Sequence, residues 1–239
     1  MLTNKKHVTL LAAAILFFVH VNIASAKIIV YDSVTTTGNA VKLTAVTKGL
    51  FFPEGGKLVK FYLDGKHIGT NLSGGDGYAF LKYIPNSKGV KHLKVESGVD
   101  ADKGILLVTG ENDRVLMIEI EGTLLAPEIQ DLFHPMQGGK EALEGLSKRF
   151  RIIYVTTLAG VRESRKWLRE NGFPLSAVLK WEGADMLAEI QKRGLKLYAI
   201  VGSRAVLSEA PDIKKRFGFE KTDNAIEVKD WNDLLKQLK

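Results

Sequence analysis

The chain contains no cysteine and little proline, 0 and 6 residues respectively among 239. Without cysteine the protein has no disulfide, no thiolate nucleophile and no thiolate-bound metal, whatever the redox state of its compartment. Aromatic residues make up 8% of the chain, and none is interleaved with a basic cluster, so we expect no nucleic-acid partner. The hydrophobic fraction of 45% and the charged fraction of 26% are typical of one or two globular domains.

Charge of either sign is not in large excess. The 34 basic and 27 acidic residues give a formal net charge of +7, and two of the basic residues, Lys5 and Lys6, belong to an N-terminal leader. The densest basic run, Lys214 to Arg216, falls where a helix exposes it to water. This mild excess gives no reason to expect a strongly acidic partner.

Long hydrophobic runs are missing except near the N-terminus. Lys5 and Lys6 precede an apolar run from Val8 to Ile23, and Ala24-Ser25-Ala26 follows with small residues. This pattern predicts a signal peptide, residues 1–26, that is cleaved before Lys27. The alternative is an uncleaved anchor, but a run of about sixteen apolar residues is short for a bilayer span. We therefore expect an exported protein, periplasmic or extracellular and soluble once the signal peptide is removed.

Residues 27–110 show short alternating runs between turn residues, which is the pattern of half-buried antiparallel strands. Val41, Leu43 and Ala45 alternate with polar residues. Asp64-Gly65 predicts a tight hairpin, because glycine adopts the positive φ that such a turn requires. The segment is therefore predicted to be an all-β domain.

The segment 59–70 resembles the central hairpin of bacterial Ig-like domains, and residues 76–79 and 89–95 resemble the strands that follow it in that family. The resemblance covers about half of the domain and implies an Ig-like sandwich. Domains of this family space, present or adhere. His67 and His92 are assigned no role, because single histidines on strands are mostly ordinary surface or core residues.

Residues 111–239 alternate apolar runs with amphipathic stretches, which predicts a parallel sheet covered on both faces by helices. The predicted strands are Val115 to Ile120, Ile152 to Thr156, Ala177 to Leu179, Leu197 to Val201 and Ala225 to Val228. The predicted helices are Gly139 to Arg149, Val161 to Asn171, Ala184 to Arg193, Leu207 to Phe217 and Trp231 to Leu238. Each of the two segments has its own periodicity and enough apolar residues for a core, so we expect each to fold alone.

The first strand of this second domain runs into Glu119-Ile120-Glu121-Gly122-Thr123. This resembles the first motif of the haloacid dehalogenase-like (HAD-like) phosphohydrolases, in which both acids are normally Asp. Thr156, at the end of Ile153-Tyr154-Val155-Thr156, resembles the second motif. The resemblance spans the whole domain and implies a three-layer, Rossmann-like α/β fold.

Two further positions follow the family's order. Lys180 matches the lysine that clamps the phosphate, with Lys196 as a weaker alternative. Gly202-Ser203 begins the fourth motif, which in the family continues with acids. The resemblance therefore implies phosphate binding by Thr156 and Lys180. Read without the family, Thr156 and Thr157 could cap the next helix, and Lys180 could be a surface lysine.

The residues that carry the family's chemistry are altered. In the family the first acid attacks phosphorus and binds magnesium, and the second is the general acid and base. Here both are glutamates, Glu119 and Glu121, whose longer side chains displace the carboxylates. Ser203 and Leu207 replace the acids of the fourth motif, which leaves Mg²⁺ short of oxygen ligands. Glu209 lies two residues beyond the second of these positions.

The segments between Glu121 and Thr156 and between Thr156 and Lys180 are barely long enough for the core helices. No cap domain fits, so the predicted site is open to solvent. Such a site suits a phosphorylated, macromolecular or membrane-associated ligand better than chemistry on a small metabolite.

Three hypotheses follow for the exported protein. The first is a catalytically degenerate HAD-like protein that binds through a phosphate-shaped site next to an Ig-like module. The second is an active Mg²⁺-dependent phosphatase with Glu119 as nucleophile and metal ligand, and Glu121 as acid, base and metal ligand. The third is a structural envelope protein in which neither domain binds a small molecule.

Overall fold

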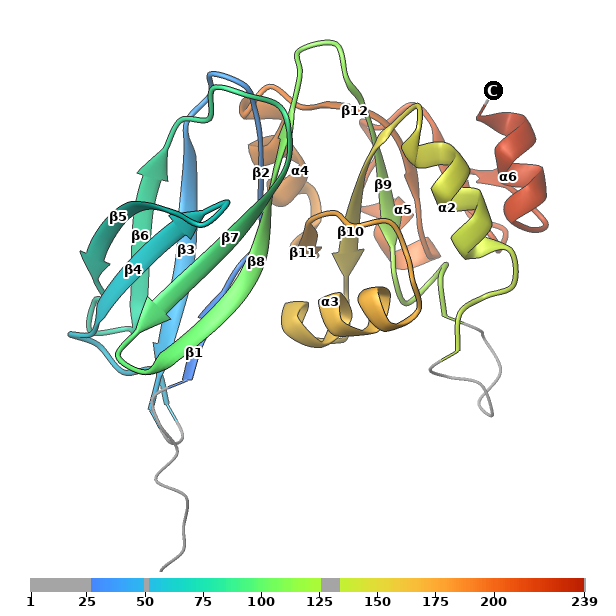
Figure 1. The fold of residues 1–239 in the computed structure, drawn as a ribbon. Helices are drawn as coiled ribbons and strands as arrows, with labels where there is room; N and C mark the ends of the chain where they lie inside the picture. Colours follow the sequence, from blue (N-terminus) through green and yellow to red (C-terminus); the bar gives the residue numbers. More distant parts are fainter. Residues whose placement is uncertain (1–26, 50–51, 126–133, 239) are drawn as a thin grey trace, which may run out of the picture.

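The computed structural model describes residues 27–49, 52–125 and 134–238. The predicted signal peptide, residues 1–26, lies outside the described residues. A β-sandwich and an α/β unit follow one another along the chain and lie side by side (Figure 1). Within the described residues no helix has the length and apolar character needed to cross a membrane.

The sandwich consists of two sheets in the described part of the chain. One has the strand order β1-β3-β6 and the other the order β2-β8-β7-β4-β5. The first sheet contains β1 (Lys27–Val30), β3 (Val41–Lys48) and β6 (Tyr78–Tyr83). The second contains β2 (Ser33–Thr36), β4 (Leu58–Leu63), β5 (Lys66–Leu72), β7 (Gly89–Ser97) and β8 (Asp100–Thr109).

This distribution of strands is that of an Ig-like domain. Strands β1, β3 and β6 take the places of A, B and E, and β4, β7 and β8 take those of C, F and G, with β5 added beside β4. β2 pairs in parallel with β8, whereas the other pairs of the sandwich are antiparallel. The all-β, Ig-like prediction for the first domain is thereby supported.

Local sequence accounts for these strands. Along β3 the side chains of Val41, Leu43 and Ala45 are buried in the sandwich, and the intervening Lys42 is exposed. Asp64 and Gly65 have φ values of 48° and 82° between β4 and β5, as a two-residue turn with two positive φ angles requires. The predicted hairpin is therefore present.

The α/β unit contains one parallel sheet with the order β11-β10-β9-β12-β13-β14. Numbered along the chain this is 3-2-1-4-5-6, the order of doubly wound nucleotide-binding sheets. Its strands are β9 (Arg114–Glu119), β10 (Arg151–Thr156), β11 (Val178–Lys180), β12 (Lys196–Val201), β13 (Arg216–Gly218) and β14 (Ile226–Glu227). Its helices are α2 (Gly139–Ser147), α3 (Val161–Glu170), α4 (Gly183–Lys192), α5 (Arg204–Ser208) and α6 (Trp231–Gln237).

The helix predicted for Leu207 to Phe217 is wrong. The chain forms the short α5 there and then β13, whose Phe217 pairs with Val201 and is buried. Pro211 explains the break, because proline has no N–H to donate within a helix and disfavours helical geometry at the preceding residue. The sheet therefore has one more strand than predicted.

The two faces of the parallel sheet are covered differently. One buried cluster joins the sheet to α2, α3 and α6, through residues that include Leu143, Leu168 and Trp231. The other joins it to α4 and α5, and also to the Ig-like sandwich. Part of the second face is thus covered by a β-sheet in place of a helix.

Strand β8 is buried on both of its faces because it contacts the α/β unit on one side and the core of the sandwich on the other. Leu106 and Val108 belong to the core of the sandwich. Ile105 and Leu107, which point the other way, belong with Val34 of β2 to the cluster of the α/β unit. Figure 1 shows β2 and β8 on the side of the sandwich that faces the α/β unit. The two units therefore share a hydrophobic cluster, which the expectation of separately folding domains does not include.

A buried acid, Asp32, adds polar bonds between the units. Its Oδ1 accepts hydrogen bonds from Arg165 Nη1 at 2.5 Å and from the Ile105 N–H at 2.8 Å. Its Oδ2 accepts from the Val178 N–H at 2.8 Å, where the edge strand β11 begins. Burial raises the pKa of Asp32, although the Arg165 guanidinium acts against that rise. One side chain from the sandwich thus binds both α3 and β11.

Candidate functional site

The residues singled out from the sequence meet at the carboxyl edge of the parallel sheet. Glu119 ends β9, Thr156 ends β10 and Lys180 ends β11, while Ser203 follows β12 by two residues. β9 and β12 are neighbours in the sheet, and the order in which the chain adds strands changes direction between them. In open α/β sheets, ligands bind outside the carboxyl ends of the strands at such a point. The predicted gathering of these side chains is present.

Glu121 is bound by the loop that follows β10. Its Oε1 accepts the Thr156 hydroxyl at 2.5 Å and the Ala159 N–H at 3.0 Å, and Leu158 N lies 3.2 Å away. Its Oε2 accepts the Thr157 N–H at 3.0 Å. Three successive N–H groups therefore converge on one carboxylate, which is the arrangement of an anion-binding nest.

Glu119 is held in a more enclosed position. Its side chain is 3% exposed. Oε2 accepts the Ser203 N–H at 2.5 Å, and Oε1 lies 3.3 Å from the Thr157 hydroxyl. A Cβ added at Gly122 would lie 2.6 Å from Glu119 Oε2, so a glycine is required where the chain passes this carboxylate. The Thr157 hydroxyl has a single proton and lies equally far from Glu121 Oε2, so it can donate to only one of the two carboxylates at a time.

The two environments move the two pKa values in opposite directions. Burial raises the pKa of Glu119, and the negative charge of Glu121 adds to the rise, against the bonds from Ser203 and Thr157. Burial also acts to raise the pKa of Glu121, but the Thr156 hydroxyl and the N–H groups of Ala159 and Thr157 outweigh it and lower the pKa. Of the two carboxyl groups, Glu121 therefore loses its proton at the lower pH.

Lys180 lies beside this loop and is exposed, and its Nζ donates to the carbonyl oxygen of Thr157 at 2.7 Å. Lys196, the alternative considered from the sequence, begins β12 at the opposite edge of the sheet. Of the two lysines, Lys180 is thus the one at the site. Glu209 accepts a hydrogen bond from the Trp181 indole N–H at 2.8 Å, so its carboxylate is already bound by that side chain.

The donor set does not fit magnesium. Among the described residues no three His, Cys, Asp or Glu side chains form a group able to hold a metal ion. Ser203 contributes its N–H, a donor that repels a cation, and Leu207 is 1% exposed and packed in the apolar cluster. The oxygens of both glutamates already accept hydrogen bonds, whereas Mg²⁺ requires near-octahedral oxygen ligands.

Sequence reasoning missed the role of the loop itself. The donors to Glu121 are mostly backbone N–H groups of Thr157, Leu158 and Ala159, which leave no mark in a sequence. Thr156 and Thr157 do not cap α3, because the N-cap residue is Gly160. Ser164 Oγ donates to Thr156 Oγ1 at 3.1 Å, which orients the threonine hydroxyl toward Glu121. In the sequence, the signal that could have pointed to this loop was the apolar strand that ends in Thr156-Thr157.

No family model matches the chain, and a search of curated proteins finds no match either. Among solved structures, an FMN-binding beta-glucuronidase from Facaelibacterium prausnitzii L2-6 is similar at 12% identity and a TM-score of 0.27, over 36% of this chain and 12% of that one. Fibronectin(III)-like modules of Clostridium thermocellum CbhA align at 16% identity and a TM-score of 0.26, over 35% of this chain and 97% of theirs.

The CARDB domain of a Pyrococcus furiosus protein aligns at 13% identity and a TM-score of 0.29, over 36% of this chain and 93% of that domain. Likenesses this weak carry no argument about function.

Proposed function

We propose that the α/β unit has a catalytically inactive HAD-like fold and that the exported protein acts by binding. The observation that supports the absence of catalysis is the position of Glu121. Its carboxylate accepts hydrogen bonds from Thr156 and from the N–H groups of Thr157 and Ala159. In the HAD-like resemblance this loop receives the phosphoryl group, so the chain's own acid occupies the place of the ligand.

The position of Glu119 supports the same conclusion. A nucleophile must reach the phosphorus atom in line with the leaving group, and displacements of about 1 Å are costly. Glu119 is buried and fixed by Ser203, and the place where a phosphoryl group is expected is taken by Glu121.

The loop keeps the hydrogen-bond donors that a phosphate group would use, but the Glu121 carboxylate already accepts their bonds. Lys180 lies beside the loop through its bond to Thr157, so a phosphorylated ligand would find a cation and three N–H donors there. It binds only if Glu121 leaves the loop. Since the lowered pKa keeps Glu121 ionised at neutral pH, the unmodified chain is expected to bind phosphate weakly.

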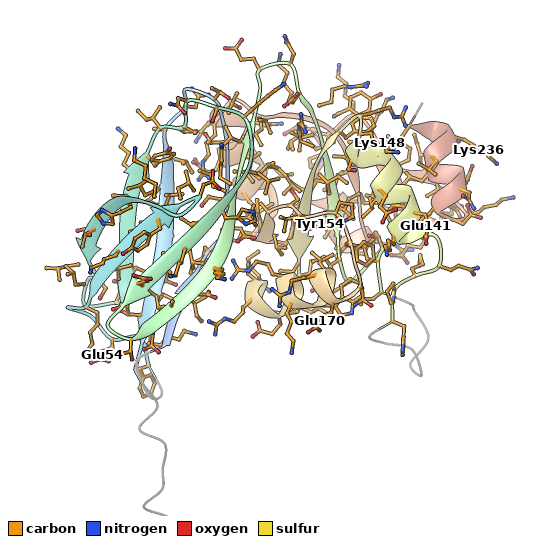
Figure 2. All side chains as sticks on the ribbon, viewed as in Figure 1. Glu54, Glu141, Lys148, Tyr154, Glu170 and Lys236 are labelled. Carbon is orange, nitrogen blue, oxygen red and sulfur yellow. The ribbon has the colours of Figure 1, made fainter. Side chains whose placement is uncertain are left out.

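The test is hydrolysis of p-nitrophenyl phosphate by residues 27–239, with and without Mg²⁺. We expect no turnover above the background of buffer and of Glu119→Gln protein. Glu141→Gln, on the exposed side of α2 and labelled in Figure 2, serves as the matched control. Turnover that requires Mg²⁺ and is lost in Glu119→Gln but not in Glu141→Gln would replace this proposal with the active phosphatase.

A structural role in the cell envelope is the second candidate, and the shared hydrophobic cluster favours it. Val34, Ile105 and Leu107 of the sandwich pack in the same cluster as the parallel sheet, which gives a rigid two-part body of the kind a spacer requires. A ligand screen separates this role from binding, because a pure spacer gains no stability from any small molecule.

A further inference from the structure

A groove of about 820 Å³ lies between the β7–β8 part of the sandwich and α3 of the α/β unit. Small-molecule sites have volumes of about 300–1,000 Å³ and often lie between domains. The groove shares no lining residue with the Glu119 and Glu121 site. It belongs to the arrangement of the two units, and neither forms it alone.

One wall of the groove is a cationic face of α3. Arg162, Arg165, Lys166 and Arg169 all line it, and their spacing of three, four and seven residues places them on one side of a helix. Lys103, on β8, adds a further positive charge to the opposite wall. The groove is therefore flanked by cations on both sides.

Acids pair with three of the five cations: from outside the groove, Asp32 pairs with Arg165 at 2.5 Å and Glu170 with Lys166 at 3.9 Å. Asp102 pairs with Arg162 at 3.1 Å and with Arg165 at 3.4 Å, and it is the one acid among the described residues that line the groove. Within the described ranges no ion pair involves Arg169 or Lys103. Arg169 on α3 and Lys103 on β8 are therefore the cations of the groove that remain available to an anion.

The floor of the groove is apolar. Ile105, Leu168 and Phe173 line it and are buried, and Leu175 lines it with 57% of its surface exposed. An exposed leucine beside buried apolar side chains is a surface that water solvates poorly. The groove thus combines an apolar floor with cationic walls.

We propose that this groove binds a small amphiphile with one acyl chain and an anionic head, a carboxylate or a phosphate. The acyl chain covers the apolar floor around Leu175, and the head pairs with Arg169 and Lys103. An inorganic anion leaves the floor exposed, and a neutral amphiphile leaves the cations unpaired. The inference is independent of the proposed function, because none of its residues touches the loop that binds Glu121.

The test uses residues 27–239 and titration calorimetry with laurate and dodecyl phosphate, both below their critical micelle concentrations. Saturable binding of either anion at one site, at least tenfold tighter than dodecanol, acetate and inorganic phosphate, is expected. A preference between laurate and dodecyl phosphate identifies the head. Equal binding of dodecanol, or binding of neither anion, overturns the proposal. So does binding of polyglutamate in place of both dodecyl anions, since that result indicates an acidic protein segment as the partner.

Variants locate the binding in the groove. The double substitution Arg169→Glu and Lys103→Glu, and separately Leu175→Asp, should each weaken binding at least tenfold. All three residues are exposed, and thermal melting confirms that the variants fold. The matched control is Lys236→Glu, on α6 and far from the sandwich in Figure 2, which should change affinity less than twofold. Equal effects of the groove and control variants overturn the assignment.

Discussion

Glu119 and Glu121 both lie 3.3 Å from the hydroxyl of Thr157, yet their pKa values shift in opposite directions. Burial dominates at Glu119, and hydrogen bonds from the loop dominate at Glu121. Two carboxylates side by side can thus have opposite effects on stability, because a pKa shift on folding is a change in folding free energy. The difference is testable with isosteric amides.

We predict that Glu119→Gln raises the melting temperature at pH 7. The folded pKa of Glu119 is raised, so its stabilising contribution is present below the unfolded pKa of about 4.3 and is lost as pH rises through the folded value. Glutamine stays neutral, keeps an acceptor for the Ser203 N–H and offers an N–H to the Thr157 hydroxyl oxygen. A gain of about 1 kcal/mol corresponds to about 2–4 °C, measured by calorimetry. A lower melting temperature at pH 7 would contradict the cause assigned to the shift.

Glu121→Gln is predicted to have the opposite effect, a loss of about 1–3 kcal/mol at pH 7, because charged acceptors form stronger hydrogen bonds than amides. The folded pKa of Glu121 is lowered, so its contribution is present above the unfolded pKa and disappears as pH falls through the folded value. The variant and the parent chain should therefore converge in stability at acid pH. Denaturant titrations at several pH values measure this, and a constant difference would refute it.

Glu121→Ala should create an anion site. The substitution leaves the N–H groups of Thr157 and Ala159 without their acceptor, and phosphate or sulfate can then fill the nest beside Lys180. We expect millimolar phosphate to raise the melting temperature of this variant and to leave that of the parent chain unchanged. Glu141→Ala, exposed on α2, is the control. Equal stabilisation of all three proteins would mean that phosphate acts elsewhere.

Asp32→Ala should destabilise the whole chain by about 3 kcal/mol, because it removes the closer of the two acidic partners of the largely buried Arg165 and the acceptor of the Val178 N–H. Since the sandwich and the α/β unit share a cluster, the parent chain should unfold in one calorimetric transition and the variant in one transition at lower temperature. Glu189→Ala, which removes an exposed pair with Lys192, should leave the melting temperature almost unchanged. Two separate transitions in the parent chain would show that the units fold independently, as the sequence patterns suggest.

Introducing acids at positions 203 and 207, where the proposed HAD-like fold would carry them, is predicted not to create a magnesium site. Leu207 is 1% exposed, so Leu207→Asp loses apolar contacts and buries a carboxylate, at a cost of about 3 kcal/mol or more. Ser203 is partly exposed, so Ser203→Asp should be tolerated better. Melting of both variants with and without Mg²⁺ is the measurement. Stabilisation of the Leu207→Asp chain by Mg²⁺ would show that the edge of the sheet can accept a metal after all.

Much of the fold was predictable from local pattern. The period-two alternation around Leu43, the Asp64-Gly65 turn and the apolar run ending at Glu119 correspond to β3, to a hairpin and to β9. The gathering of Glu119, Thr156 and Lys180 was predictable as well, because parallel strands bring their carboxyl ends to one edge. β13 was missed, because Leu207, Ala210, Ile213 and Phe217 recur at the spacing of a helix and conceal a three-residue strand among them.

Sequence by itself determined most of the strands and helices and which acids stand at the end of β9, because alternation, turn chemistry and chain order are local properties. Only the tertiary structure decided what those acids do. The donors that bind Glu121 are backbone N–H groups, which every sequence possesses and which become a site only when a loop aligns them. Likewise, the apolar side chains of Ile105 and Leu107 indicate that these residues are buried, but they do not indicate which surface covers them. The hydrophobic effect has no direction, and the covering surface comes from residues that are distant in the chain.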